Sequence, residues 1–244
     1  PLTPFAGGAA ETYNFGARNH YQRPVERWNL GASGYYEITG GLEAYADTSY
    51  MNNKTVAQIA ESASFNRPFE TNCDNPLLQA GRGPNGAGAF SFADFTGNFD
   101  TDKNFVSCND ILAAGGTADV QFINSHRNVE GGPRISTYEN STWRAVTGLR
   151  GDIGDDFTMD IFAQFSGTKG TRISQRDLNF KRVQQALFAV DDGAGNAVCR
   201  DTSGGCVPWN IFERNADGST AVTSAQTDFI QGTVIVAGAV SYTH

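Results

Sequence analysis

Apolar and polar side chains alternate with a period of two over residues 27–51. From Trp28 to Ile38 the even positions are apolar, aromatic or small, and the odd positions are mostly polar or small. After a turn at Gly40 the same alternation resumes. Only a β-strand places successive side chains on opposite faces, so this pattern predicts a β-hairpin. Each arm has about ten residues, which is the length of a tilted strand that crosses a bilayer.

A second segment, from Trp143 to Phe165, repeats this plan around a turn at Gly154, although Phe162 interrupts its polar side. An apolar face opposed to a polar one is typical of a transmembrane β-barrel, with lipid outside and water inside. The two hairpins are separated by a long segment, so short and long connections alternate along the chain. Such alternation is expected of a barrel whose two rims carry different kinds of loop.

The predicted elements extend this pattern to the whole chain. We expect residues 1–244 to be part of one β-barrel domain, with strands near 13–22, 26–38, 42–52, 134–152, 157–169 and 233–244, and long loops over 53–133 and 170–231. Within the loops, 117–128 has a strand pattern that we assign to an extracellular hairpin, and 178–190 and 223–230 have helical spacing. The predicted fold class is all-β: a portion of a large antiparallel transmembrane β-barrel with long extracellular loops carrying short helices.

Composition narrows the classes of protein further. The chain has 244 residues and a formal net charge of −8. No cluster of Lys and Arg offers a surface for nucleic acid, so we expect no nucleic-acid partner. No run of eighteen apolar residues predicts a transmembrane helix. The chain begins at Pro1 and ends at His244 inside a predicted strand, so we expect a fragment of a longer protein.

Four cysteines, Cys73, Cys108, Cys199 and Cys206, lie in polar, loop-like stretches without a CxxC pair. A zinc site is therefore not expected. Of the three possible connectivities, proximity in sequence favours Cys73–Cys108 and Cys199–Cys206, which would imply an oxidising compartment. Four free thiols remain the alternative.

Two further motifs resemble binding loops. Gly81, Gly83 and Gly86 fit the letters of a dinucleotide-binding loop, but the flanks lack its strand and helix, so a surface loop is expected. Asp100, Asp102 and Asn104 resemble the start of a calcium loop, but the required glycine and the final glutamate are missing. An EF-hand is therefore rejected, and an irregular calcium site stays open.

Catalytic chemistry finds no support in the sequence. No serine or cysteine has a histidine and a carboxylate in a nucleophile context. Asp155 and Asp156 lie in a turn, where hydration explains them. Glu43 and Asp47 lie on a polar strand face, where hydration or pairing with Arg144 or Arg150 explains them. We expect no enzyme, no catalytic residue, no cofactor and no resident metal, and the residues that bind a ligand are unknown.

An ordered set of short segments resembles early barrel strands and loops of TonB-dependent outer-membrane receptors of Gram-negative proteobacteria. These segments are residues 13–15, 21–27, 35–38, 42–47, 130–134, 148–153, 184–187 and 206–212. The resemblance covers nearly the whole chain, but the plug, the TonB box and most of the barrel are missing from it.

The resemblance implies an active transporter in the outer membrane. Such receptors close a barrel of roughly 22 strands around a plug, import a scarce nutrient of the siderophore, cobalamin or oligosaccharide class, and draw energy from the TonB–ExbB–ExbD system. The expected partners are then that system, acting through the absent plug, outer-membrane lipid and a small-molecule nutrient. The alternative is an extracellular β-sandwich that acts as an adhesin or binding module.

Overall fold

The computed structural model describes residues 13–80, 108–154, 156–213, 215 and 219–243. In this part the chain is all-β, with long antiparallel strands and a few short helices, as predicted. It divides into two compact units. The core unit comprises Pro1–Asn19, Ile59–Arg134 and Arg176–Gly232, and the sheet unit comprises His20–Gln58, Ile135–Gln175 and Thr233–His244.

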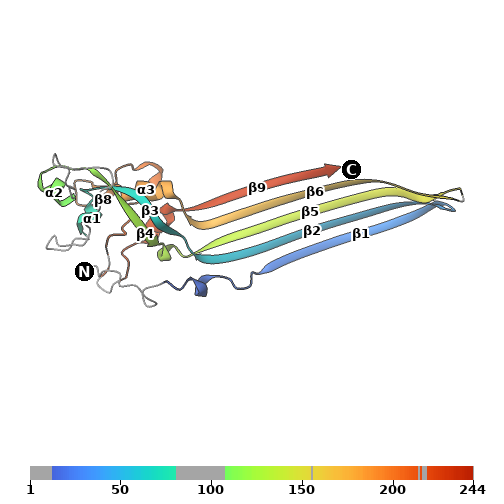
Figure 1. Ribbon diagram of the computed structural model, residues 1–244, viewed down its shortest axis with the longest axis horizontal. Helices are drawn as coiled ribbons and strands as arrows, with labels where there is room; N and C mark the ends of the chain where they lie inside the picture. The colour runs from blue at the N-terminus through green and yellow to red at the C-terminus, as the bar shows by residue number, and fades with distance from the viewer. Residues whose placement is uncertain (1–12, 81–107, 155, 214, 216–218, 244) are drawn as a thin grey trace. The chain divides into compact units, whose positions relative to one another are not determined.

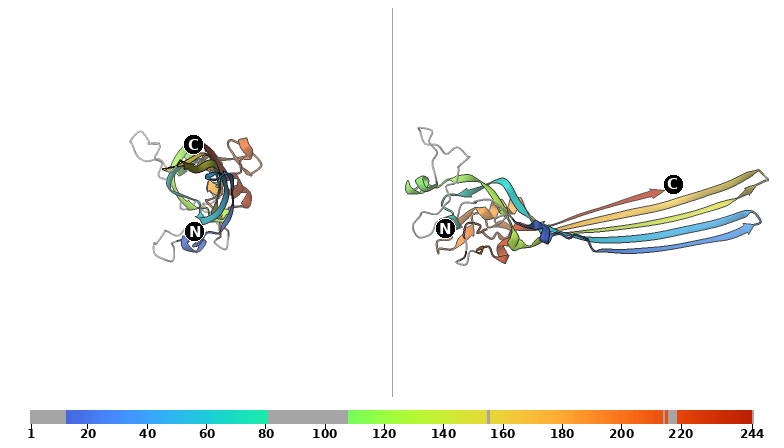
Figure 2. Two further views of the ribbon diagram at one scale, coloured as in Figure 1. Left: turned by 90° about the vertical axis from the view of Figure 1, so that its right-hand side faces the viewer. Right: turned by 60° about the horizontal axis from the view of Figure 1, so that its bottom comes forward.

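Five strands form the main sheet in the order β1-β2-β5-β6-β9, so neighbours in the sheet follow one another along the chain (Figures 1 and 2). Their bounds are β1 Val25–Thr39, β2 Leu42–Glu61, β5 Pro133–Ile153, β6 Phe157–Leu178 and β9 Gln231–Thr243. β1 pairs antiparallel with β2, and β5 with β6. The two predicted hairpins are therefore confirmed, each with a glycine at positive φ in its turn: Gly41 (φ 97°) and Gly154 (φ 68°).

The predicted strand over 13–22 is wrong. The structure has a 3-10 helix, η1, over Phe15–Arg18, and β1 begins only at Val25. Asn14 caps this helix, because its side-chain oxygen accepts a hydrogen bond from the Gly16 amide at 3.1 Å. This local hydrogen bond stabilises a turn where the side chains alone suggested an extended chain.

The predicted loop 53–133 contains more strand than expected. β2 continues to Glu61, and β3 (Ala63–Asn72) pairs antiparallel with β4 (Asp119–Arg127) in a two-stranded sheet. The strand predicted within 117–128 is therefore present, but the predicted hairpin with the strand near 134 is wrong, because β4 pairs with β3 outside the main sheet. Helices α1 (Pro76–Ala80), α2 (Cys108–Ala113) and η2 (Val129–Gly131) complete the described part of this connection.

The predicted loop 170–231 also contains ordered elements. β6 continues to Leu178, and the two predicted helices are present as α3 (Phe180–Leu187) and α4 (Ser224–Ile230). Asn179 caps α3 by accepting from two backbone amides, and Thr223 begins α4 with a capping box. A small hairpin of β7 (Ala189–Asp191) and β8 (Ala197–Cys199) lies between them, followed by the 3-10 helix η3 (Ser203–Gly205).

The core unit has an apolar core of its own. Leu187, Trp209 and Ile230 are fully buried in one cluster with Phe69 and Phe122, so helices and the β3–β4 hairpin share it. Two disulfides, Cys73–Cys108 and Cys199–Cys206, cross-link this unit, with the pairing that sequence proximity favoured. Burial of apolar side chains at about 25 cal/mol per Å² stabilises such a unit, and the cross-links restrict its unfolded chain.

Candidate functional site

The main sheet has two faces of opposite character, which the strand register defines. Glu43 on β2 accepts a hydrogen bond from Arg150 on β5 at 2.7 Å, so these residues share one face, the polar face. The residues that alternate with them form the apolar face. Its large members are Trp28, Leu30, Tyr36, Tyr50, Trp143, Leu149, Phe157, Ile161 and Phe165.

The apolar face is exposed in spite of its composition. Trp28 keeps 68% of its surface accessible, Phe157 72% and Ile161 64%. An exposed apolar surface of this extent marks an interaction with protein, lipid or another sheet rather than with water. The apolar face is therefore the strongest functional feature of the sheet unit.

One end of the apolar face is marked by aromatic and then charged residues. Trp28 and Trp143 lie towards the end that carries the long connections. Beyond Trp28, Glu26 and Lys54 stand directly opposite each other on the same face. The face thus changes from apolar through aromatic to charged along its strands, as a surface at a membrane boundary does.

The polar face carries a network of hydrogen bonds that links three strands. The Tyr45 hydroxyl donates to Asp160 at 2.8 Å, and the Arg150 guanidinium lies 5.3 Å from the Tyr45 ring centroid. Arg150 and Asp160 are direct partners in the β5–β6 register. Glu43 is paired with Arg150, one of the two arginines that the sequence offered as partners for the carboxylates of this face.

Gly148 makes room for this network. A Cβ atom at Gly148 would lie 2.7 Å from the Ile161 carbonyl oxygen and 2.7 Å from Tyr45 Cζ. The Tyr45 ring therefore covers the backbone of β5 where the side chain is missing, an arrangement that rescues a glycine within a sheet.

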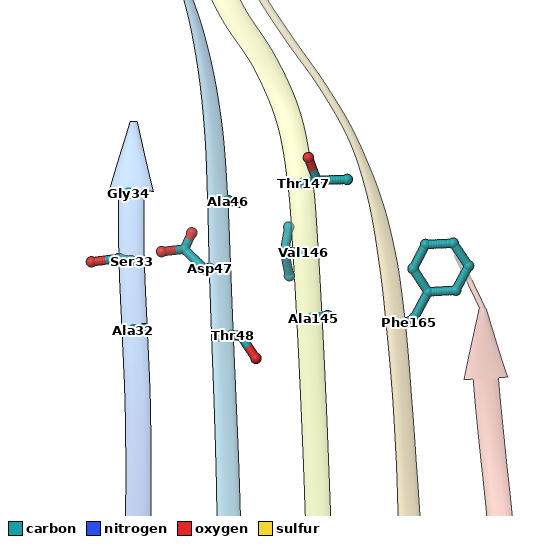
Figure 3. A pocket seen from close by; sticks show the side chains of 10 residues that line it. All are labelled: Ala32, Ser33, Gly34, Ala46, Asp47, Thr48, Ala145, Val146, Thr147 and Phe165. Atoms are coloured by element: carbon teal, nitrogen blue, oxygen red, sulfur yellow. The ribbon is translucent and has the colours of Figure 1, made fainter. Parts of the chain in front are cut away.

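A shallow hollow of about 450 Å³ lies over the middle of the sheet (Figure 3). It exists because small residues meet there on neighbouring strands. In Figure 3 the side chains of Val146 and Thr147, successive in β5, point to opposite sides of the strand. The lining residues are Ala32, Ser33, Gly34, Ala46, Asp47, Thr48, Ala145, Val146, Thr147 and Phe165. They present few groups with which a specific ligand could be oriented.

The core unit holds a buried carboxylate, Glu61, with 1% of its surface exposed. The Tyr13 hydroxyl donates a hydrogen bond to Glu61 Oε2, and Arg18 Nε lies 3.4 Å from Glu61 Oε1. Desolvation, and then the hydrogen bond to Glu61, raise the pKa of the Tyr13 phenol above its ordinary value. The phenol therefore keeps its proton and acts as a donor to the carboxylate at neutral pH.

A second polar group of the core unit is centred on His126 and Glu130. His126 Nε2 lies 3.6 Å from Glu130 Oε2, and the His126 ring meets Trp209 edge to face with centroids 5.3 Å apart. Burial alone would raise the pKa of Glu130, but the polar interactions with the nearby His126 side chain and with the backbone lower it overall. Glu130 is thus held in its charged form.

Several predicted features lie outside the described residues or acquire a structural role. Gly81, Gly83, Gly86, Asp100, Asp102 and Asn104 are not among the described residues, and neither is Asp155. The disulfide candidates all form cross-links. In the part of the chain that is described, no three His, Cys, Asp or Glu side chains are grouped to hold a metal.

Sequence reasoning missed Glu61 and the contact between Tyr45 and Gly148. Glu61 lies 48 residues from Tyr13 and 66 from Arg127, so no local pattern signals these contacts. The available signal was a carboxylate directly after residues 56–60, which are apolar except for Gln58.

Two further findings concern the helices of the structure and the comparison of the chain with known proteins. Among the described residues, no helix combines the length and apolar content needed to span a membrane. A scan of the chain against protein-family models gave no match, and searches of the curated proteins and of the solved structures gave none either.

Proposed function

We propose that the main sheet is part of the wall of a transmembrane β-barrel in the outer membrane of a Gram-negative bacterium. The observation that carries this proposal is the length and sharp ending of the exposed apolar face. Trp143 and Ile153 are ten residues apart on β5, and Trp28 and Ile38 are ten residues apart on β1. At roughly 3.3 Å per residue this distance is about 33 Å along the strand. A tilt of roughly 40° reduces it to about 25 Å, the height of the apolar band on such barrels.

The other face and the connections agree with this proposal. The polar face, with Glu43, Arg150 and Asp160, suits a wet lumen. The short turns at Gly41 and Gly154 join β1 to β2 and β5 to β6 at one end of the sheet. The long connections, from β2 to β5 and from β6 to β9, leave from the other end. This is the pattern of an up-and-down barrel with short turns on one rim and large loops on the other.

The proposed activity is energised import of a scarce nutrient of the siderophore, cobalamin or oligosaccharide class. It rests on the resemblance of the sequence segments to TonB-dependent receptors. In this proposal the cross-linked core unit belongs to the extracellular side and takes part in capturing the nutrient. The plug, which would connect to the TonB–ExbB–ExbD system, is supplied by a part of the protein outside these 244 residues.

An extracellular β-sandwich is the second candidate, and the independent, disulfide-linked core unit favours it. A sandwich would bury the apolar face of its sheet against a second sheet. The exposure of Trp28, Phe157 and Ile161 argues against that arrangement.

Lipid contact can be tested position by position along β6. Single cysteines replace Met159, Ile161 and Ala163 on the apolar face, and Asp160, Phe162 and Gln164 on the polar face. Each is labelled with a small fluorophore, and quenching by brominated lipid is measured in reconstituted vesicles. We expect strong quenching at the first three positions and weak quenching at the other three. Equal quenching at both sets, or a monodisperse monomer without detergent that melts cooperatively, would contradict the barrel.

Transport is tested separately. Cells that express the intact protein should accumulate the nutrient only when TonB is present. Uptake that persists without TonB would reject energised import and leave the barrel itself standing.

A further inference from the structure

Residues 13–19 lie against the end of β2 in the core unit and hold it through three polar contacts. Tyr13 and Arg18 both contact the Glu61 carboxylate, the latter at 3.4 Å. The Asn19 side-chain oxygen accepts a hydrogen bond from the Ala60 amide at 2.8 Å. These contacts fix a segment whose own residues are almost all exposed.

The site beneath this segment is a junction of several strands. The Glu61 carbonyl accepts from Arg127 at 2.8 Å, and the Arg127 guanidinium lies 4.9 Å from the Tyr13 ring and 5.1 Å from the Phe65 ring. The Ser62 carbonyl accepts from the Asn128 amide at 2.9 Å. Residues 60–62 therefore connect the segment 13–19 to the end of β4.

We propose that residues 13–19 form a strap that opens and closes over Glu61. The closed strap supplies a phenol and a guanidinium as partners for this carboxylate, which is 1% exposed, and a buried polar group left without its partners is costly. The open strap exposes Glu61 and removes the Tyr13 ring, one of the two rings that the Arg127 guanidinium contacts. The state of the strap is thereby transmitted to β4 through Arg127.

The geometry explains why the strap can open without unfolding its surroundings. The apolar cluster around Trp209 contains no residue of 13–19, so opening the strap leaves that core intact. Segments held by a few polar contacts and little apolar burial open far more often than the fold as a whole. This inference does not depend on the transport function.

Hydrogen exchange of the intact protein tests the strap. The amide of Ala60 and the amides of residues 15–19 report the closed state, and α3 (Phe180–Leu187) reports the core. Two variants weaken the contacts from opposite sides: Glu61→Gln, and the double variant Tyr13→Phe with Arg18→Gln. We expect exchange in the strap and at Ala60 to accelerate about tenfold in both variants, with α3 unchanged.

Glu70→Gln is the matched control. It removes an exposed carboxylate of β3 in the same unit, and exchange in the strap should not change. Unaltered strap exchange in both test variants would overturn the proposal. Equal acceleration in the strap and in α3 would also overturn it, because Glu61 would then support the whole fold rather than a separate strap.

Discussion

Replacing Gly148 by alanine probes the hydrogen-bonded network of the polar face. The new Cβ would lie 2.7 Å from both Tyr45 Cζ and the Ile161 carbonyl oxygen, distances that real Cβ atoms do not adopt. The Tyr45 ring must move away, but this movement leaves the new Cβ too close to the Ile161 carbonyl oxygen of β6. Gly148→Ala therefore displaces Tyr45 from Asp160 and from Arg150.

The size of the effect is set mainly by the overlap of the new Cβ with the β6 backbone and the Tyr45 ring. Forcing an extra carbon against packed neighbours costs about 1–3 kcal/mol. The hydrogen bond from Tyr45 to Asp160 and the stacking of Arg150 on the Tyr45 ring are also lost, but both are exposed and solvent weakens them. Alanine also restricts the unfolded chain, which raises the free energy of unfolding by about 0.4–1 kcal/mol and offsets part of this loss.

Gly34→Ala is the matched control, because a Cβ at Gly34 meets no atom within 4 Å. Both variants share the effect of alanine on the unfolded chain, so their difference isolates the effect of crowding at Gly148. We expect the free energy of unfolding, measured by denaturant titration in vesicles, to be lower by about 1–3 kcal/mol in Gly148→Ala than in Gly34→Ala. In a Tyr45→Phe background, which lacks the hydroxyl, the difference should shrink. Equal stability of the two alanine variants would refute the reasoning.

Three further predictions concern the sheet and the core unit. Ile161→Arg on the apolar face should lower the free energy of unfolding in vesicles by about 2–4 kcal/mol. Phe162→Arg, at the next position of β6 and on the polar face, should have little effect. Equal losses would contradict the two-faced sheet. Replacing Cys73 and Cys108 by serine should lower the free energy of unfolding by about 1 kcal/mol more than replacing Cys199 and Cys206, because the two bridges join residues 35 and 7 positions apart. Thermal unfolding of both double variants measures this difference. A larger loss in the variant without Cys199 and Cys206 would contradict an entropic origin. Burial would raise the pKa of Glu130 and Asp74, but polar interactions lower both. The two carboxylates therefore stabilise the fold above their unfolded pKa values of about 4, and this stabilisation is lost as the pH falls through the lowered folded values. When the free energy of unfolding is measured between about pH 7 and pH 2, the loss should be smaller in Glu130→Gln.

The two long hairpins could be predicted from the sequence because their information is local. Alternation between Trp28 and Ile38, followed by a glycine turn, defines both the strand and the face of each side chain. The paired cysteines were also predictable, since each closes the shorter available loop. Local signals failed at 13–22, where a hydrogen bond from the Gly16 amide to Asn14 outweighs a weak alternation.

The extent of β3 and the site around Glu61 could not be predicted, because both depend on distant residues. β3 deviates from regular alternation at Asn66, whose positive φ of 46° and hydrogen bond with Ser125 accompany a shift in register against β4. The partners of Glu61 lie as many as 66 residues away, and their meeting is set by the fold of the whole core unit. Gly148 likewise shows its role only beside Tyr45, which belongs to the other hairpin.

The order of the main sheet has a consequence for how it assembles. Each strand neighbours the strand of the sheet that precedes it in the chain, so the β1–β2 and β5–β6 hairpins can form alone and then join side by side. Pairing within a hairpin closes only a short stretch of chain and is fast, whereas joining the hairpins must wait for the long connection between them to fold. Growth can therefore proceed by adding one finished hairpin at a time, and at each stage the edge of the newest strand has to be protected until the next hairpin arrives.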